Sequence, residues 1–236
     1  MKHQKLGQHY LVDEAVVRRV VGCADIKPSD RVLEIGTGRG ALTKELAQMG
    51  ASLLGYEIDR ANFEATLAAV KGTKARIVLA DAFTQNPAFD VLVASLPYSE
   101  SGTFVRWLST RKFSEAVAVL QKDFVQKISA APGDRNYRGI SAVAQIAFEI
   151  EALGEVGRAS FYPPPKVDSV IVKFSPKRAI SGDEVSRVIR LFSLRRRQVD
   201  SALAELGFRS GRDHGKKRVT SLTPDEVHVI CEPARQ

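Results

Sequence analysis

Short apolar runs that alternate with helical stretches constrain the fold of this 236-residue chain more than any other feature. Each run is nearly continuous in apolar residues, as strands buried on both faces of a sheet must be. The predicted strands are residues 31–35, 52–56, 76–80, 89–94 and 115–121, and the predicted helices among them are residues 41–49, 59–70 and 104–108. Strands that alternate with helices favour a mostly parallel sheet covered on both faces. We therefore predict an α/β fold.

The pattern changes after residue 140. Residues 144–156 fit either a helix or a strand, and the sequence leaves that choice open. Residues 167–174 alternate enough to form a strand, and an antiparallel pair at the edge of the sheet would suit this region. A run of three prolines, Pro163–Pro165, lies between the two segments and should be rigid.

The last quarter of the chain is predicted to be helical. A boundary is expected at residues 175–182, which contain Pro176 and Gly182. Residues 183–206 beyond it have a helical period, and Thr223 precedes a proline at a good helix start. We expect two domains, residues 1–175 with the sheet and residues 176–236 as a small helical domain.

The charge of the chain favours a polyanion as partner without proving one. The net charge is +8, and residues 175–236 carry 13 Lys and Arg against 8 Asp and Glu. More than half of the excess positive charge therefore lies in the predicted helical domain. Many basic proteins bind no nucleic acid, so the charge alone leaves the partner open.

The two cysteines and the apolar segments set the expected compartment. Cys23 and Cys231 lie far apart and outside any metal-ligand spacing, which indicates free thiols in a reducing cytoplasm and no metal site. No apolar run approaches the roughly 20 residues that cross a membrane. The basic amino-terminal residues precede no apolar signal segment. We expect a cytoplasmic monomer with no membrane partner.

A glycine-rich turn, Glu34–Gly40, follows the first predicted strand and precedes a helix. Glycines at such a turn let the backbone approach a ligand closely. Gly36 and Gly38, with Ala41, also satisfy the dinucleotide-binding pattern. Glu57 ends the second strand, 21 residues after Gly36, where a carboxylate can bind ribose hydroxyls. These features suit a nicotinamide dinucleotide and S-adenosylmethionine equally.

Two further strand ends favour S-adenosylmethionine. Asp81 ends the third strand, where its carboxylate can accept from an adenine amine, and Ser95 ends the fourth. In open parallel sheets, ligands bind beyond the carboxyl ends of the strands, so these residues should meet at one rim with Gly36 and Glu57. A nicotinamide oxidoreductase would also need a titratable residue at this rim for hydride chemistry, and the sequence offers none.

The turn Ser95–Tyr98 suits transfer of a methyl group to an aromatic amine. The amine of adenine is a poor nucleophile, because its lone pair is delocalised into the ring. The Ser95 oxygen and the Leu96 carbonyl can accept its two hydrogens and favour the more nucleophilic pyramidal nitrogen. Pro97 stiffens the turn, and Tyr98 offers a face on which a flipped base can stack. Taken alone, this turn could equally be an ordinary one with a half-buried tyrosine.

Four segments resemble the ribosomal RNA adenine dimethyltransferases of the KsgA type, a family that includes archaeal and eukaryotic relatives and the Erm resistance enzymes. Residues 6–11, Leu-Gly-Gln-His-Tyr-Leu, resemble its amino-terminal signature. Residues 34–43 are similar to its cofactor loop, and residues 191–197 to its Phe-x-x-Arg-Arg-Lys stretch. Residues 160–169, Ser-Phe-Tyr-Pro-Pro-Pro-Lys-Val-Asp-Ser, match its long and distinctive Phe-x-Pro-Pro-Pro-Lys-Val-Asp-Ser segment. The resemblance covers nearly the whole chain.

The resemblance implies a Rossmann-like S-adenosylmethionine-dependent methyltransferase sheet with a small helical domain, and it assigns a role to each matched residue. The residues implied in cofactor binding are Gln8, His9, Leu11, Gly36, Gly38, Glu57, Ile58, Asp81, Ala82 and Ser95. The residues implied at the reacting base are Ser95, Leu96, Pro97, Tyr98 and Phe161. In this assignment Tyr98 and Phe161 enclose the flipped adenine. From its own neighbourhood alone, Phe161 would be predicted to be a core residue.

Basic clusters are the candidate RNA contacts. The segment Arg195, Arg196 and Arg197, together with Lys166, would bind phosphates, and residues 216–218 would form a second patch. The arginines could instead form a solvated helix face. Tyr137 and Arg138 lie in a polar loop and are further candidates for RNA contact, whereas Trp107 is expected in the core.

The implied function is N6-methylation, with dimethylation expected, of adjacent adenosines near the 3′ end of small-subunit ribosomal RNA, during ribosome biogenesis. The expected partner is this RNA or a preribosomal particle. One departure from the family is Ser95, because the motif usually begins with Asn. It supports one alternative, a catalytically weak or inactive RNA-binding assembly factor of the same fold. A methyltransferase of large-subunit ribosomal RNA is a separate alternative.

Overall fold

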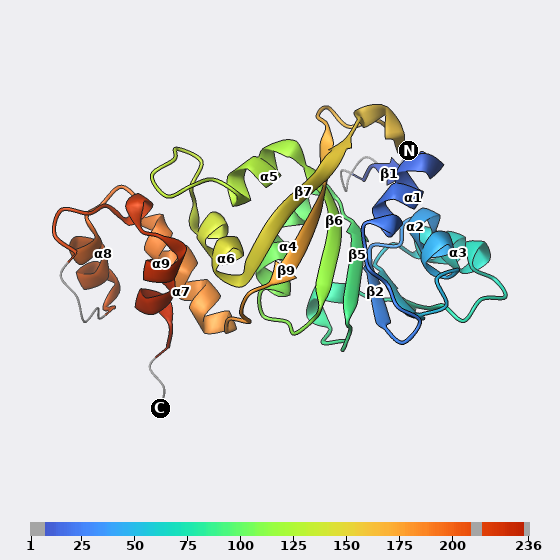
Figure 1. Ribbon diagram of the computed structural model, residues 1–236, viewed down its shortest axis with the longest axis horizontal. Coiled ribbons are helices and arrows are strands. Elements are labelled where there is room, and N and C mark those ends of the chain that lie inside the picture. The colour runs from blue at the N-terminus through green and yellow to red at the C-terminus, as the bar shows by residue number, and fades with distance from the viewer. Residues whose placement is uncertain (1–7, 209–213, 234–236) are drawn as a thin grey trace. The chain divides into compact units, whose positions relative to one another are not determined.

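The structure is a computed structural model that describes residues 8–208 and 214–233. Leu6 and Gly7 of the amino-terminal motif lie outside these residues. The helices are α1 Glu14–Gly22, α2 Ala41–Leu46, α3 Arg60–Ala69, α4 Ser101–Leu108, α5 Lys122–Ile128, α6 Gly139–Ala147, α7 Gly182–Ser193, α8 Val199–Leu206 and α9 Pro224–Cys231. The strands are β1 Tyr10–Leu11, β2 Arg31–Ile35, β3 Ser52–Glu57, β4 Arg76–Leu79, β5 Val91–Ser95, β6 Glu115–Gln121, β7 Phe148–Val156, β8 Phe161–Tyr162 and β9 Ser169–Pro176 (Figure 1).

The described strands form a seven-stranded sheet in the order β4-β3-β2-β5-β6-β9-β7, with a separate ribbon of β1 and β8. The neighbours from β4 to β6 are parallel, and β9 runs antiparallel to β6. Six consecutive residues of β6 are buried, which explains why its sequence shows no polar alternation. The five predicted strands and the strand predicted at residues 167–174 are therefore confirmed, and the fold is α/β.

The ambiguous segment 144–156 contains both kinds of structure. α6 ends at Ala147, and β7 begins at the next residue. Nearly every side chain of α6 is buried, so the helix lacks the polar stripe that would have revealed its period. The sequence reading missed α1, although Asp13 caps it by accepting from the Ala15 and Val16 amides at 3.0 and 3.2 Å.

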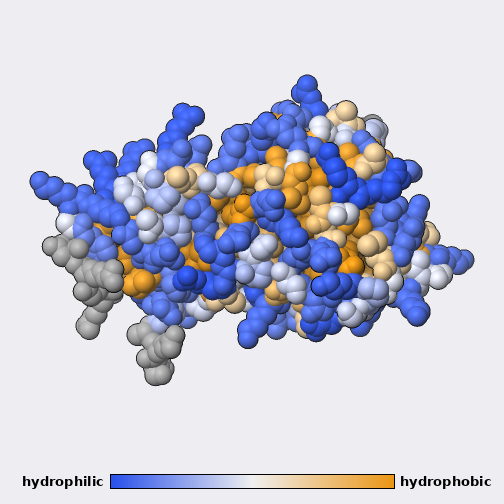
Figure 2. Space-filling model, viewed as in Figure 1, coloured by the Kyte–Doolittle hydropathy of each residue, from blue (hydrophilic) through white to orange (hydrophobic). Residues whose placement is uncertain are grey.

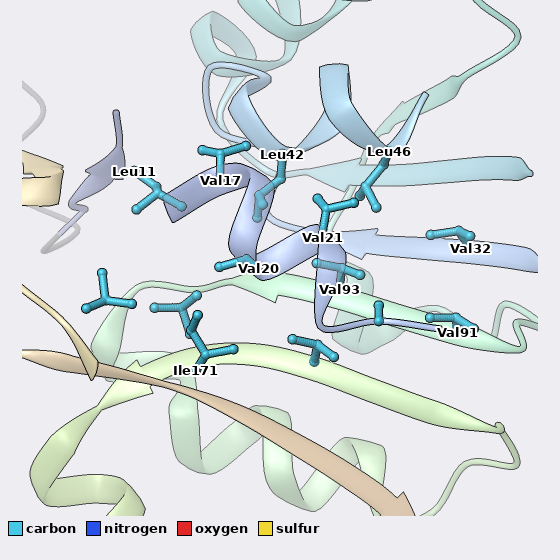
Figure 3. Close-up of a cluster of buried hydrophobic side chains, with 14 of the residues drawn as sticks. Leu11, Val17, Val20, Val21, Val32, Leu42, Leu46, Val91, Val93 and Ile171 are labelled. Atoms are coloured by element: carbon cyan, nitrogen blue, oxygen red, sulfur yellow. The ribbon is translucent and has the colours of Figure 1, made fainter. Parts of the chain in front are cut away.

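A hydrophobic cluster joins α1 and α2 to one face of the sheet (Figure 3). Val17, Val20 and Val21 of α1 contribute to it. Val20 and Val21 lie three and four residues after Val17, so all three face the same side of the helix. The other labelled members come from the ribbon, α2 and the strands, namely Leu11, Val32, Leu42, Leu46, Val91, Val93 and Ile171. The cluster thus fixes the helix that follows the glycine-rich turn against the strands beneath it.

Contacts divide the chain into two compact units. The first runs to Thr103 and adds Lys112–Lys122 and Glu151–Pro176. The second comprises Phe104–Arg111, Asp123–Ile150 and the chain from Lys177. The division into domains at residues 175 and 176 stays a prediction. The compact units, by contrast, group α5 and α6 with the carboxy-terminal helices.

Inside the second unit, α6 packs against α7 and α9. Gly139 begins α6 where a Cβ atom would lie 3.1 Å from side-chain atoms of Ile189 and Phe192. Thr223 caps α9 in a capping box with Glu226, as its sequence predicted. The face of the molecule in Figure 2 is mostly hydrophilic, with hydrophobic side chains gathered over β5 and β6. Among the described residues, no helix is both long and apolar enough to cross a membrane.

Candidate active site

A cavity of about 580 Å³ opens at the carboxyl ends of the parallel strands in the first unit. Gly36, Glu57, Asp81 and Ser95 follow or end the four strands β2 to β5, and all four line it. Parallel strands place their carboxyl ends at one edge of the sheet, and these four residues lie together there as predicted. The ten residues assigned to the cofactor from the sequence all line this cavity, as do Leu96 and Pro97.

The glycine-rich turn forms one wall of the cavity. Gly36, Gly38 and Gly40 have φ angles of 75°, 55° and 84°, in the region that favours glycine. A Cβ atom on Gly40 would lie 2.9 Å from the Cβ of Ala69, so α3 also packs directly against this turn. At its three glycines the turn can therefore present only backbone to the cavity.

Glu57 is buried and holds the turn in place. Its carboxylate accepts from the backbone amides of Gly38 at 2.8 Å, Ile58 at 2.9 Å and Asp59 at 2.9 Å. Burial raises the pKa of Glu57, and these amide hydrogen bonds oppose the rise because they favour the charged form. The residue thus shapes the cavity wall in addition to lining it.

Glu34 is a second buried carboxyl group of the cavity, to which the sequence reading gave no role. It is fully buried on β2, and neither carboxyl oxygen has a hydrogen-bond partner among the described residues. Burial raises the pKa of Glu34 to about 8; the nearby Thr43 hydroxyl opposes this rise, and the charge of Glu57 adds to it. The sequence signal was available, since a charged residue within a buried strand is rare unless it has a partner or a ligand.

The turn Ser95–Tyr98 places its tyrosine beside the cavity, where its hydroxyl and ring both have partners. The Tyr98 hydroxyl lies 2.7 Å from the buried hydroxyl of Ser169. The imidazole of His9 lies against its ring, with centroids 5.5 Å apart. His9 Nδ1 in turn donates to the Pro163 carbonyl at 2.7 Å. Ser169 and Pro163 belong to the segment 160–169, so this segment positions Tyr98 through two contacts.

Phe161 takes a different position from Tyr98. It is 4 % exposed and lies in the hydrophobic cluster with Leu11, its partner across the β1–β8 ribbon. Neither Tyr98 nor Phe161 is among the residues that line the cavity. The structure thus agrees with the core environment predicted from the neighbourhood of Phe161. The adjacent aromatic residue, Tyr162, is the exposed one, at 63 %.

The two basic runs of the second unit lie side by side. Gln198 and Arg218 form an isolated antiparallel bridge. The Val199 amide donates to the Lys217 carbonyl at 2.9 Å, and the Val219 amide donates to the Arg197 carbonyl at 3.2 Å. Residues 195–197 and 216–218 therefore form one surface, which we call the joined basic surface. Within it, Arg197 pairs with Glu205 at 2.6 Å and Lys217 with Glu226 at 2.6 Å.

Other predicted positions have mixed outcomes. Tyr137 is fully buried and packs edge-on against Phe192, with centroids 5.3 Å apart, so the expectation that it touches RNA is wrong. Arg138 donates to the backbone carbonyls of Arg135 and Tyr137. Trp107 is buried, as predicted. Lys166 is exposed in the first unit. The described residues contain no cluster of three metal-binding side chains.

The sheet order, the glycine-rich turn and the cavity at the strand ends define the fold of S-adenosylmethionine-dependent methyltransferases. Comparison with known proteins specifies the family. A family model described as ribosomal RNA adenine dimethylase matches residues 1–229. A probable ribosomal RNA small subunit methyltransferase A from Pyrococcus abyssi is 34% identical over 248 residues, which span 99% of this chain and 92% of that protein.

Two solved structures are similar over nearly the whole chain. A dimethyladenosine transferase from Plasmodium falciparum superposes with a TM-score of 0.79 at 25% identity, and the match covers 94% of this chain and 96% of that one. The 23S rRNA methyltransferase ErmE gives a TM-score of 0.65 at 25% identity, with 94% and 99% covered. The chain belongs to the ribosomal RNA adenine dimethylase family, and the predicted family is confirmed.

Proposed function

We propose that this protein transfers methyl groups from S-adenosylmethionine to N6 of adjacent adenosines near the 3′ end of small-subunit ribosomal RNA and forms dimethyladenosine. One observation carries the proposal. The ten residues that the family resemblance assigns to the cofactor and the first three of the Ser95–Tyr98 turn line a single cavity. We propose that it acts in ribosome biogenesis, as a cytoplasmic monomer, on the RNA or a preribosomal particle.

The residues present fit the cofactor. The cavity volume of about 580 Å³ lies within the range of small-molecule sites. The buried carboxyl group of Glu34 has no partner among the described residues, and a ligand that carries positive charge would supply one. The glycine-rich turn leaves room for the cofactor to approach the protein backbone, and the exposed Ile58 offers an apolar surface for the adenine ring of the cofactor.

The proposed catalysis is positioning. The sulfonium of the bound cofactor supplies an activated methyl group, so no general base is needed before transfer. The Ser95 oxygen and the Leu96 carbonyl accept the amine hydrogens and orient the nitrogen lone pair. Ser169 and His9 fix the ring of Tyr98, on which the flipped base stacks. The proton lost from nitrogen after transfer passes to water.

The joined basic surface is proposed to bind RNA phosphates. Its exposed arginines and lysines come from two chain segments that the fold brings together. Neutralising phosphates releases counterions, so RNA affinity should fall steeply as salt rises. Replacing Arg195, Arg196 and Arg197 by Ala should flatten this dependence, measured as the slope of log affinity against log salt concentration. A slope equal to that of the unmodified protein would mean that these arginines form a solvated face.

A methylation assay tests the reaction itself. Small ribosomal subunits, large subunits and protein-free RNA are each incubated with the protein and labelled S-adenosylmethionine, and modified nucleotides are mapped. The expected result is label on adjacent adenosines near the 3′ end of the small-subunit RNA. Label on large-subunit RNA would mean that the substrate is large-subunit RNA, the kind of RNA for which the 23S rRNA methyltransferase ErmE is named. Absence of label from every substrate would favour an assembly factor without turnover, for which the Ser95 departure is the supporting observation.

A further inference from the structure

The β1–β8 ribbon has two faces of different character. Its register pairs Tyr10 with Tyr162 and Leu11 with Phe161. Directly opposed residues in an antiparallel pair point to the same face, and successive residues point to opposite faces. Leu11 and Phe161 are buried in the hydrophobic cluster, so Tyr10 and Tyr162 belong to the other face.

That other face exposes an unusual amount of apolar surface. Val12 continues the alternation beyond Tyr10, since its amide donates to the Ser160 carbonyl at 2.9 Å. Val12 is 53 % exposed and Tyr162 is 63 % exposed. We call Tyr10, Val12 and Tyr162 the ribbon face. Exposed apolar side chains that gather at one place indicate a binding surface more strongly than scattered ones do.

The ribbon face adjoins the cavity. Tyr10 and Val12 line the cavity, and the guanidinium of Arg39 lies over the Tyr10 ring, 4.7 Å from its centroid. β1 packs beside the start of the chain's first helix, at the carboxyl end of the sheet (Figure 1). A cation beside aromatic rings is the composition of surfaces that bind single-stranded nucleic acid.

Contacts connect the ribbon face with the residue proposed to hold the target base. Tyr162 precedes Pro163, whose carbonyl accepts from His9. The His9 ring lies against Tyr98. His9 and Pro163 therefore connect the residue that would stack the flanking nucleotide, Tyr162, with the residue that would stack the target base, Tyr98.

We propose that the ribbon face, through Tyr162, stacks the RNA nucleotide that flanks the target adenosine. The inference rests on the proposed function and names a contact that neither the family resemblance nor the cavity assigns. Every base has a face that can stack, so Tyr162 holds the neighbouring nucleotide without reading its identity. Its role is to hold the strand in register while the target base leaves the stack.

A fluorescent RNA tests this contact without any methyl transfer. The probe is an RNA hairpin with two adjacent adenosines in its loop and 2-aminopurine at the flanking position. Stacking quenches 2-aminopurine, so binding by the unmodified protein should lower the fluorescence. Tyr162→Ala should abolish the quenching and weaken RNA binding about 5- to 150-fold, the range for loss of one stacked base. Tyr162→Phe should retain both.

Two controls separate stacking from general damage. Leu67→Ala alters another exposed apolar residue, 42 % exposed on α3, and should leave RNA affinity and quenching unchanged. Tyr162→Ala should leave the melting temperature and the affinity for S-adenosylmethionine unchanged. If Tyr162→Ala does not fold, photocrosslinking of unmodified protein to 4-thiouridine at the flanking position decides the point, and crosslinks that include neither the ribbon face nor residues 160–166 overturn the proposal.

The failures of the two proposals are distinguishable. If the unmodified protein methylates RNA but Tyr162→Ala retains quenching and affinity, the stacking contact is wrong and the enzyme function stands. If the protein quenches the probe through Tyr162 but methylates no substrate, the contact stands and the enzyme function is wrong. Concentration-dependent self-association that Tyr162→Ala abolishes, without any effect on RNA, would assign the ribbon face to a second copy of the chain and overturn the proposal.

Discussion

The strand ends at the rim of the cavity and the β1–β8 ribbon beside it are held in place by different means. Each rim residue ends or follows a strand of at least four residues in the parallel part of the sheet, so its position depends on many backbone hydrogen bonds. The ribbon has two residues in each strand and depends on Leu11 and Phe161 in the hydrophobic cluster. The comparison indicates a cofactor side built into the sheet and a substrate side that relies on a few side-chain contacts.

The largest expected effect comes from a substitution that disrupts the β1–β8 ribbon. Phe161→Ala should lower the free energy of unfolding by about 3–5 kcal/mol, because it removes a buried aromatic ring and leaves a cavity. Chemical denaturation measures this. Under the alternative role, as an aromatic that encloses the target base, the variant would instead lose methylation while keeping wild-type stability. Tyr162→Leu, which changes an exposed neighbour, is the matched control and should unfold at the wild-type midpoint.

Ser95 tests the rim at the point where this chain departs from its family. Ser95→Ala should slow methylation about 100-fold, because a misplacement of the target amine by about 1 Å costs that much. Ser95→Asn should be at least as fast as the unmodified enzyme. A serine hydroxyl is shorter than an asparagine amide, so the base must sit slightly deeper or accept a bridging water.

The two methylation steps should also differ in this enzyme. A monomethylated amine has one hydrogen left to donate, so the second transfer should suffer more than the first. Mass spectrometry over time should show monomethyladenosine accumulating before dimethyladenosine. Equal rates for Ser95→Ala and the unmodified enzyme in both steps would leave positioning to the Leu96 carbonyl and Tyr98.

A substitution of Glu57 tests the cofactor side of the cavity. Glu57→Ala removes a carboxylate that accepts three backbone amides and holds the glycine-rich turn. It should weaken S-adenosylmethionine binding by about 1.5–3 kcal/mol, the value of hydrogen bonds to a charged group. Calorimetry measures the affinity, with Glu64→Ala on the exposed surface of α3 as control. Unchanged affinity would remove Glu57 from the cofactor site.

Glu34 gives the smallest predicted effect, through pH. Its pKa is raised to about 8 by burial, whereas an unfolded glutamate titrates near 4.5. The folded protein therefore holds a proton that the unfolded chain releases, and stability from this group is full below pH 4.5 and declines as pH rises toward 8. Glu34→Gln should remove that decline, so the variant gains about 1–1.5 kcal/mol relative to the unmodified protein between pH 6 and pH 7, because one proton of difference is worth about 1.4 kcal/mol per pH unit.

Denaturation at the two pH values, on each protein, measures the difference. Glu57 also has a raised pKa, but it is present in both proteins, so its titration largely cancels in the comparison. Parallel pH profiles for the two proteins would show that Glu34 is ionised in the fold. Cofactor added to both would then report whether positive charge in the cavity changes the profile.

The sequence predicted the rim better than the ribbon for a physical reason. Strands buried on both faces leave long apolar runs, and a polar residue at the end of each run marks the edge where parallel strands meet. β1 and β8 are too short to have a period, and their partners lie about 150 residues apart, so no local pattern revealed them. Tyr137 was misplaced because its loop is polar in sequence although its ring is fully buried.

The β1–β8 ribbon can form only late in the synthesis of the protein, because its two strands lie far apart in the sequence. His9 bonds to Pro163 across a separation of 154 residues, and the Tyr10–Tyr162 pairing spans a similar distance. Because chains emerge from the ribosome starting at the amino terminus, β2 to β6 can pair long before β8 exists. The position of His9 against Tyr98 is therefore completed only after residue 163 has emerged. A nascent chain could form the strand-end wall of the cavity, with Gly36, Glu57 and Asp81, while it still lacks the wall that contains His9 and Leu11.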